Sequence, residues 1–264
     1  MISNSFDPAR SAERCRRYRR RVLEVSQRVQ ALHIATAFSC TEIVDAVYNG
    51  LKTDTDTFLM SKGHGAIMQY VVLEDLGVLP KHALDNYCTS GGMLGAHPDC
   101  GNPGIAASTG SLGHGLAMAV GMALAESVKG GGGLVHCLLG DGELHEGSTW
   151  EAVLLAASLG ASNLVAYVDA NGWQSCSDRT RDTHPALYPL APKFAGFGWQ
   201  VAQVDGHDGA AMVQAVRGRD GTRPMMLVCD TVKGKGVSFM ADSVAWHYKR
   251  PKPDEFAAAM AELA

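Results

Sequence analysis

Short, almost wholly apolar runs alternate along this chain with segments of helical periodicity, and this alternation restricts the fold more than any other feature. The runs lie at residues 57–60, 134–139, 164–169, 199–204 and 225–230. A strand that is apolar on both faces has to be covered on both faces, and strands that are separated by helices pair in parallel. The sequence therefore predicts an α/β protein, with a doubly wound parallel sheet and helices on both faces.

Helices are expected wherever apolar residues recur every three or four positions. They should span residues 11–34, 41–50, 65–77, 112–128, 146–160, 189–197 and 209–219, with a further short helix near the end of the chain. Two long segments, 88–111 and 171–188, are expected to be loops. The sequence contains no internal repeat, low-complexity tract or obvious linker, so we predict that residues 1–264 form a single domain.

The overall composition argues against several classes of function. With a net charge of −4, the chain has no general attraction to nucleic acid or anionic membranes. No apolar stretch reaches the roughly 18–20 residues that cross a bilayer, and no signal-peptide core follows Met1. The seven cysteines are scattered, without a CxxC pair, which indicates reduced thiols. We therefore expect a cytoplasmic protein that binds neither nucleic acid nor membranes.

An arginine-rich stretch, Arg14–Arg21, reads RCRRYRRR. A transit-peptide fragment and a phosphate-binding patch are two ways to read it. Apolar residues at Val22, Val25 and Val29 follow at helical spacing. We therefore interpret the stretch as the solvated start of a helix that runs to His33.

Two successive predicted strands end in side chains that are typical of a metal site. Asp141 lies between two glycines directly after the run 134–139, and Asn171 follows the next strand, with 28 residues between GDG and Asn171. A buried carboxylate needs compensation, and Mg²⁺ prefers oxygen ligands together with substrate phosphates and water. Singly, a helix cap and a turn would explain the two residues. As a pair at one sheet edge, where ligands of parallel sheets collect, they favour a Mg²⁺ site.

The two glycines around Asp141 indicate a phosphate-binding site beside the predicted metal site. Gly140 and Gly142 allow a sharp turn and the close approach of another group. The next helix is expected to begin near Glu146, so its free N–H groups should face the same edge of the sheet. A phosphate group bound there would share the cation with Asp141.

Six motifs follow one another in the order in which they occur in transketolases. They read SKGHGAIMQY, HPD, STGSLGHGLAMAVGMALA, GDGELHEGSTWEA, NLVAYVDANG and TVKGKGVSFMADSVAWH. Over roughly residues 20–250 the chain resembles the amino-terminal half of transketolase, and GDG followed at this interval by Asn is the signature of thiamine-diphosphate enzymes. The resemblance implies the PP-type domain of the thiamine-diphosphate-binding fold, with thiamine diphosphate and Mg²⁺, or Ca²⁺ or Mn²⁺ in its place, as cofactors.

The resemblance also implies roles for individual residues of this chain. Asp141, Asn171 and the carbonyl of Trp173 would hold the metal ion. The cofactor would be bound by His64, Gly110, Ser111, Leu112, Gly142, Glu143, Asn171, Ser175 and His247. The catalytic histidines would be His33, His64, His97 and His247, with His33 and His97 binding hydroxyl groups of the ketose donor and assisting proton transfer.

The activity that the resemblance implies is the transfer of a two-carbon ketol unit from a ketose to an aldose. Full-length transketolases continue with a domain that supplies an activating glutamate and aromatic residues around the cofactor ring. This chain ends at Ala264, and Glu255 and Glu262 lie in a terminal segment without the context of that glutamate. We therefore expect a separate carboxy-terminal transketolase subunit, carrying the pyrimidine-binding domain, in an α₂β₂ assembly. Glu146 and Glu151 would lie on a helix that faces the partner.

Two departures from the family pattern leave the substrate open. Ala35–Thr36 replaces a glycine-rich segment, and His114 replaces a glutamine; each change would either alter the donor pocket or only repack a loop. Donor and acceptor are sugars or sugar phosphates, or the substrates of a specialised carboligase of a biosynthetic pathway. The α subunit of a 2-oxoacid dehydrogenase also carries GDG…N, but it lacks the four histidines. A dinucleotide-binding domain would need GxGxxG after its first strand, which this sequence lacks.

Overall fold

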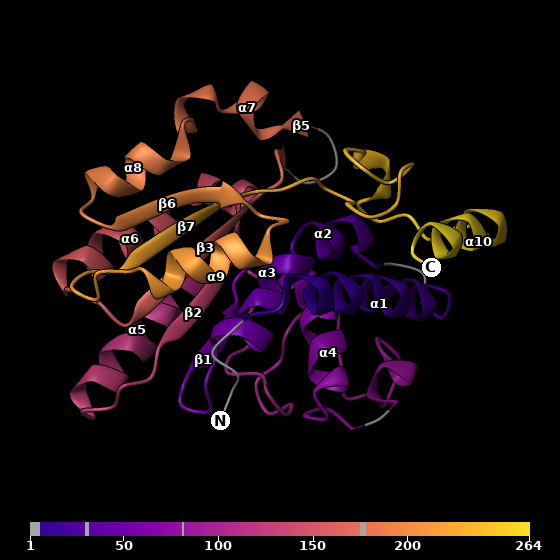
Figure 1. The fold of residues 1–264 in the computed structure, drawn as a ribbon, viewed down its shortest axis with the longest axis horizontal. Helices are drawn as coiled ribbons and strands as arrows, with labels where there is room; N and C mark the ends of the chain where they lie inside the picture. The colour runs from indigo at the N-terminus through magenta and orange to yellow at the C-terminus, as the bar shows by residue number, and fades with distance from the viewer. Residues whose placement is uncertain (1–5, 30–31, 81, 175–177) are drawn as a thin grey trace.

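Five parallel strands form the central sheet of the computed structural model, which describes residues 6–29, 32–80, 82–174 and 178–264. The order across the sheet is β1–β2–β3–β7–β6 (Figure 1). Their bounds are β1 Thr57–Met60, β2 Val135–Gly140, β3 Leu164–Ala170, β6 Gln200–Asp205 and β7 Met225–Asp230. These are the five strands that the apolar runs predict, and every pairing between them is parallel.

Helices cover both faces of this sheet, which confirms the predicted α/β class. Helices α1 Pro8–Ser26, α2 Ile34–Ser39, α3 Thr41–Ala46, α4 Ala66–Asp75 and α9 Gly209–Arg217 share one core with alternate strand residues such as Leu138, Tyr167 and Leu227. Helices α5 Gly115–Val128, α6 Gly147–Ser158 and α8 Leu190–Gly196 share the other core with Leu139, Val168 and Val228. Successive strand residues point to opposite faces, so each strand contributes to both cores.

The register of β2 and β3 fixes where the predicted metal ligands emerge. Gly140, the last residue of β2, pairs with Asp169 near the end of β3. Asp141 and Asn171, which follow these strands, therefore leave the sheet at the same edge. The segment after β7 starts there too, because Ala170 pairs with Asp230.

The first helix is shorter than its periodicity predicts. Asp7 caps it by accepting the backbone N–H groups of Ala9 and Arg10, and it ends at Ser26 instead of continuing to 34. The last turn closes tightly: the N–H groups of Gln27 and Arg28 donate to carbonyls three residues back. Val29 and Leu32 are still buried, so the apolar spacing continues although the chain has left the helix. His33 precedes α2 and is not part of the first helix.

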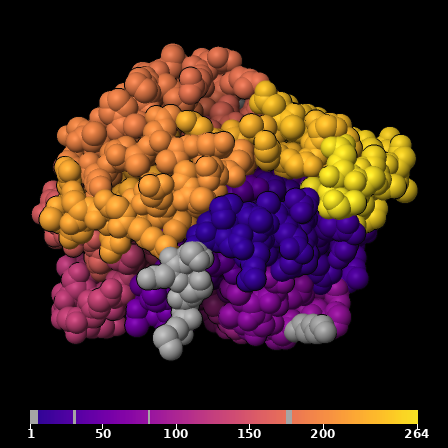
Figure 2. Space-filling model, viewed as in Figure 1, coloured from indigo at the N-terminus to yellow at the C-terminus, as the bar shows by residue number. Residues whose placement is uncertain are grey.

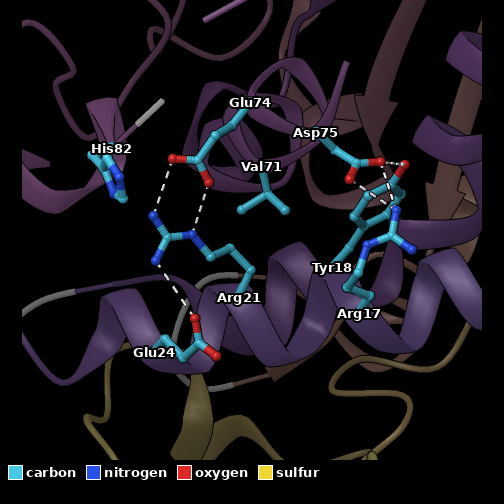
Figure 3. Close-up of a pocket in the computed structure, with 8 residues that line it drawn as sticks. All are labelled: Arg17, Tyr18, Arg21, Glu24, Val71, Glu74, Asp75 and His82. Carbon is cyan, nitrogen blue, oxygen red and sulfur yellow. Dashed lines mark hydrogen bonds and ion pairs between the residues drawn. The ribbon is translucent and has the colours of Figure 1, made fainter. Parts of the chain in front are cut away.

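The arginines of α1 form a solvated face only in part: Arg16 and Arg17 are exposed, whereas Arg19 is buried. Figure 3 shows Arg17 paired with Asp75, and Arg21 paired with Glu74, both across to α4. Arg19 is buried and binds Glu42 through two contacts of 2.7 Å. The arginines therefore fasten α1 to the helices beside it, because carboxylates on those helices meet them at bidentate geometry.

The segment 171–188, predicted to be a loop, contains small elements. These are the antiparallel pair β4 Trp173–Gln174 and β5 Asp178–Arg179, helix α7 Thr180–Thr183 and a 3₁₀ turn η5 Pro185–Leu187. The other short turns are η1 Val47–Leu51, η2 Gly63–Gly65, η3 Ala83–Asn86, η4 Asp141–His145 and η6 Val244–Trp246, of which η1 is π-helical. Helix α6 begins one residue after the predicted Glu146, since η4 comes between it and β2.

The final helix, α10 Pro253–Glu262, packs against α1. In the space-filling view the yellow C-terminal segment lies beside the indigo N-terminal helix (Figure 2). Glu262 accepts hydrogen bonds from the backbone N–H and the hydroxyl of Ser238, and Glu255 pairs with Lys249. Of the helices in the described ranges, none combines the length and the apolar character that a membrane crossing requires.

Candidate active site

A cavity of about 290 Å³ lies at the carboxyl edge of the sheet. The segments after β1, β2, β3 and β7 all contribute to its wall. Of the residues predicted for the site, eleven line it: His33, His64, His97, Gly110, Leu112, Asp141, Gly142, Glu143, Asn171, Trp173 and His247. Ser111 is exposed beside them and does not line the cavity, and Ser175 lies outside the described residues.

Asp141 is a buried carboxylate, 2% exposed, in the turn η4. Its Oδ1 accepts the N–H of Gly142 at 2.9 Å. Its Oδ2 accepts the N–H of Gly172 at 2.8 Å and the hydroxyls of Thr180 and Tyr188 at 3.2 and 3.1 Å. No ion pair joins it to a Lys or Arg among the residues that the structure describes. Burial, followed by the nearby charge of Asp169, raises the pKa of Asp141 to about 6.

Two further oxygens belong to residues that line the same cavity as Asp141. The amide of Asn171 donates to Asp169 at 3.2 Å, and its Oδ1 accepts the N–H of Trp173 at 3.1 Å. The carbonyl oxygen of Trp173 lies beside Gly142, 3.5 Å from where a β-carbon on that glycine would stand. A carboxylate, an amide oxygen and a carbonyl oxygen are thus gathered at the ends of β2 and β3. These donor types suit a hard divalent cation.

The described residues hold no cluster of three or more His, Cys, Asp or Glu side chains able to bind a metal ion. A cation in this cavity would therefore depend on one protein carboxylate together with neutral oxygens. Mg²⁺ commonly binds in that way and takes its remaining ligands from phosphates and water. The residues present fit such an ion, because Asp141 is a buried carboxylate without an ion pair to Lys or Arg in the described ranges.

The four predicted histidines come together, although they are far apart in the sequence. The ring of His33 lies 5.5 Å from that of His64, 6.4 Å from that of His97 and 5.2 Å from that of His247, measured between centroids. Burial lowers the pKa of His33 to about 4 and that of His247 to about 3, and it holds the pKa of His64 well below its ordinary value. At neutral pH these three imidazoles are uncharged and each offers one donor and one acceptor.

Sequence reasoning missed a buried ion pair beneath the cavity. Lys62 and Asp169 are fully buried and pair with each other; Lys62 also donates to the carbonyl of Thr36 at 3.2 Å. Asp169 accepts hydrogen bonds from the hydroxyls of Ser39 and Thr231 as well. Both charges stand at strand ends, in the motifs SKGH and VDAN. A charged residue near the carboxyl end of an apolar strand was the signal that could have found them.

Lys233 and Tyr248 also line the cavity and were missed; Glu146, which was predicted to face the partner, lines it too. The ammonium of Lys233 lies 2.8 Å from Nδ1 of His247, and its positive charge is the second cause, after burial, of the low pKa of that histidine. The Tyr248 ring lies 4.4 Å from that of His33 and 4.6 Å from that of His247. Lys233 belongs to the motif TVKGKG, where two lysines among glycines were its sequence signal.

Three predicted cofactor residues are held by the protein's own contacts. The carboxylate of Glu143 accepts the hydroxyl of Ser61 at 2.5 Å and the N–H of Gly113 at 3.0 Å. Gly110 has a φ of 144°, which favours glycine, and a β-carbon there would stand 3.0 Å from the ring of His97. The N–H of Gly142 donates to Asp141, as described above.

The departures at Ala35–Thr36 and His114 lie in different places. Thr36 lines the cavity, and the carbonyls of Ala35 and Thr36 accept the N–H of Gly234 and the ammonium of Lys62. His114 is exposed and absent from the cavity wall, and its Nδ1 lies 3.2 Å from the carbonyl oxygen of Leu112. The first departure therefore borders the candidate site, whereas the second affects the loop behind it.

Known transketolase sequences are similar to this chain along nearly its whole length. Residues 26–263 match the protein family described as transketolase, thiamine diphosphate binding domain. The chain is 33% identical over 256 residues to a subunit of the apulose-4-phosphate transketolase of Phocaeicola vulgatus, and the match covers 93% of this chain and 90% of that protein. It is 35% identical over 257 residues to 6-deoxy-6-sulfo-D-fructose transketolase subunit SqwG of a Clostridium species, covering 93% of each.

Solved structures share the fold. A transketolase from Pichia stipitis superposes with a TM-score of 0.89 at 24% identity and covers 96% of this chain. The transketolase from Leishmania mexicana gives 0.83 at 24% identity and covers 98%. The chain spans about 41% of the length of each of these two proteins. Since the family match and the similar subunits extend over almost all of the sequence, the chain belongs to the transketolase family and corresponds to its thiamine-diphosphate-binding domain.

Proposed function

We propose that this chain is the diphosphate-binding subunit of a two-chain transketolase that uses thiamine diphosphate and Mg²⁺. The observation that carries the proposal is the buried Asp141 carboxylate, which has no cationic partner in the described structure and stands beside the oxygens of Asn171 and Trp173. Asp141, Asn171 and the Trp173 carbonyl would hold Mg²⁺, with Ca²⁺ or Mn²⁺ as substitutes. The ion would in turn bind the diphosphate of the cofactor.

The other wall residues would position the cofactor. We propose that the turn Gly142–Glu143, together with His64 and His247, binds the diphosphate end, and that Gly110, Ser111 and Leu112 line the remainder; Ser175 is proposed for the same role. The buried pair Lys62–Asp169 supports this arrangement, because Asp169 orients the amide of Asn171. Once bound, the cofactor supplies the electron sink for breaking and forming a carbon–carbon bond.

The four histidines would bind the sugar substrate and transfer protons. Uncharged imidazoles bind hydroxyl groups as donors and as acceptors, and they move protons between them. We propose that His33 and His97 bind the hydroxyls of a ketose donor, while His64 and His247 hold protons near the reacting carbon. The neutral state of His33, His64 and His247 supports this role, since a cluster of charged imidazoles would repel its own members.

A second polypeptide would complete the active site. The similar proteins from Phocaeicola and Clostridium are named as subunits and match this chain over 90% or more of their length. The face formed by α5 and α6 leaves Met118, Leu124, Leu154 and Leu155 exposed, next to the exposed Glu151. We propose a companion chain carrying the pyrimidine-binding domain, an α₂β₂ assembly, and sugars or sugar phosphates as substrates. The six described cysteines are all free thiols, which supports a cytoplasmic location.

Replacing Asp141 tests the metal and the cofactor together. Asp141→Ala should abolish the Mg²⁺-dependent binding of thiamine diphosphate, because the remaining protein ligands are neutral oxygens. Calorimetric titration of the cofactor with and without Mg²⁺, in the presence of the companion chain, measures this loss. Asp230→Ala is the matched control, because Asp230 ends a neighbouring strand but is absent from this cavity wall. Unchanged cofactor affinity in Asp141→Ala would refute the ligand role.

A further inference from the structure

Two segments of the chain contribute to the cavity wall, and one exposed aspartate joins them. The first segment follows β3 and carries Asn171 and the pair β4–β5. The second follows β7 and carries Lys233 and His247. Asp242, in the second segment, reaches both members of the β4–β5 pair.

Asp242, Trp173 and Arg179 each contact the other two. Its Oδ1 accepts the indole N–H of Trp173 at 2.9 Å, and its Oδ2 accepts Arg179 at 2.6 Å. Trp173 and Arg179 pair across β4–β5, and the guanidinium of Arg179 lies 4.6 Å from the centre of the Trp173 ring. The carboxylate therefore fixes the side chain of Trp173 from one edge, while the guanidinium covers its face.

Asp242 is itself held in place by the second segment. Its backbone N–H donates to the carbonyl of Lys233 at 2.7 Å, and its φ is +53°, a conformation that Asp and Asn tolerate better than most side chains. The Lys233 ammonium lies 2.8 Å from His247. The carboxylate of Asp242 is thus anchored on the wall of the cavity that carries these two residues.

We propose that Asp242 is a positioning residue that sets the carbonyl of Trp173 against the cavity and so tunes metal binding. The inference rests on the proposed function, because it takes that carbonyl as a Mg²⁺ ligand. The backbone of Trp173 is held at its N–H by Asn171 and its carbonyl lies beside Gly142. The hydrogen bond to Asp242 fixes the side chain of the same residue and leaves the peptide little freedom to turn.

The solvent exposure of the Arg179–Asp242 pair distinguishes a role in metal binding from a role in folding stability. The side chains of Arg179 and Asp242 are 47% and 50% exposed. Ion pairs in such positions add little to folding stability. Removing the charge of Asp242 should therefore leave the Tm of the cofactor-free protein unchanged, and its effect should appear only when the metal binds. Residues that orient metal ligands typically change affinity by about ten- to a hundredfold when replaced.

The test compares Asp242→Asn, Trp173→Phe and the double variant. Asparagine keeps the size and the tolerance for positive φ but removes the charge, while phenylalanine removes the indole N–H with its five-membered ring and keeps an aromatic face for Arg179. Each single variant should raise the Mg²⁺ concentration for half-maximal thiamine diphosphate binding about tenfold. The double variant should be no worse than Trp173→Phe alone, because Asp242→Asn weakens the same contact that Trp173→Phe removes. Asp220→Asn, which breaks a comparable exposed pair with Arg223, should match the wild type.

An unchanged Mg²⁺ requirement in Asp242→Asn would overturn the proposal, as would an equal rise in Asp220→Asn. A wild type without any Mg²⁺-dependent cofactor binding would instead be a failure of the proposed function. In that case the hydrogen exchange of the Trp173 indole N–H, measured by NMR without added metal, decides the role of Asp242. Faster exchange in Asp242→Asn supports the positioning role, and equal exchange refutes it.

Discussion

Burial is the largest cause of altered protonation at several residues of the cavity. Asp141 and three of the cavity histidines are all kept towards their neutral forms, and in each case loss of water is the largest cause. The same effect reaches His136, in β2 outside the cavity. Its Nδ1 lies 2.9 Å from the hydroxyl of Tyr167, and its Nε2 has no hydrogen-bond partner among the described residues.

His136 should make the stability of the fold sensitive to acid. Burial lowers its pKa to about 4 in the folded protein, against 6.5 for the ordinary group. Between these values the unfolded chain binds the extra proton, so stability is lost as the pH falls from 6.5 towards 4, by on the order of 3 kcal/mol. His136→Gln should remove that part of the pH dependence in urea unfolding curves at pH 7.5 and pH 4. Tyr167→Phe, which keeps the imidazole, should retain it.

The sequence pattern predicted site residues whose side-chain type is rare in their local sequence context. Asp141 between glycines and the histidines in irregular segments were found in this way, and the structure brings them to one cavity. Lys62 and Asp169 were not found, because each looks like an ordinary surface charge until the fold buries both of them together. Pairing of that kind depends on two strands that are far apart in the sequence.

At the scale of elements, carboxylates on neighbouring helices decide how α1 sits. Arg14 donates to the fully buried Asp45 on α3, and Arg19 donates to Glu42 on the same helix. The ring nitrogen Nδ1 of His207 lies 2.9 Å from Glu42 and ties it to the turn after β6. Burial alone would raise the pKa of Glu42, but Arg19 and His207 lower it to about 2. The helical period shows which residues of α1 face inward, but not that charged residues among them are paired.

Removing the buried arginine should therefore cost far more than removing an exposed one. Arg19→Met leaves Glu42 without its main positive partner, and the free energy of unfolding should fall by about 3–5 kcal/mol. Arg10→Met removes an exposed pair with Asp7, and the loss should stay below about 1 kcal/mol. Denaturant unfolding at pH 7 measures both. Equal losses in the two variants would show that the Arg19 pair behaves like a surface contact.

Strand positions were predicted better than helix ends. The five apolar runs match the five strands closely. Four of these strands are almost wholly buried, and only the edge strand β6 is partly exposed. The first helix was extended eight residues too far, since Val29 and Leu32 stay buried after the helix has ended at Ser26. The small elements of 171–188 were missed because a two-residue pairing leaves no periodicity to detect.

For the whole molecule, the proposed function predicts dependence on a second chain. The purified chain alone should show no ketol transfer from a panel of free and phosphorylated ketoses, whereas the chain co-expressed with its companion should be active. Size-exclusion chromatography with light scattering should give a mass equal to two copies of each. Ketol transfer by this polypeptide alone would contradict the two-chain arrangement. Decarboxylation of a 2-oxoacid by the pair, without ketol transfer, would favour the alternative enzyme class.

The position of β2 and β3 inside the sheet has a consequence for how a ligand comes and goes. Both strands are paired on each side, so the strand ends that carry Asp141 and Asp169 are held firmly by the sheet. The pair β4–β5 and the segment after β7 are held differently, because they are joined to each other only at the exposed Asp242 in the contacts described above. A ligand should therefore pass where these two segments separate, and a change at Asp242 should alter both how fast the ligand enters and how tightly it is held.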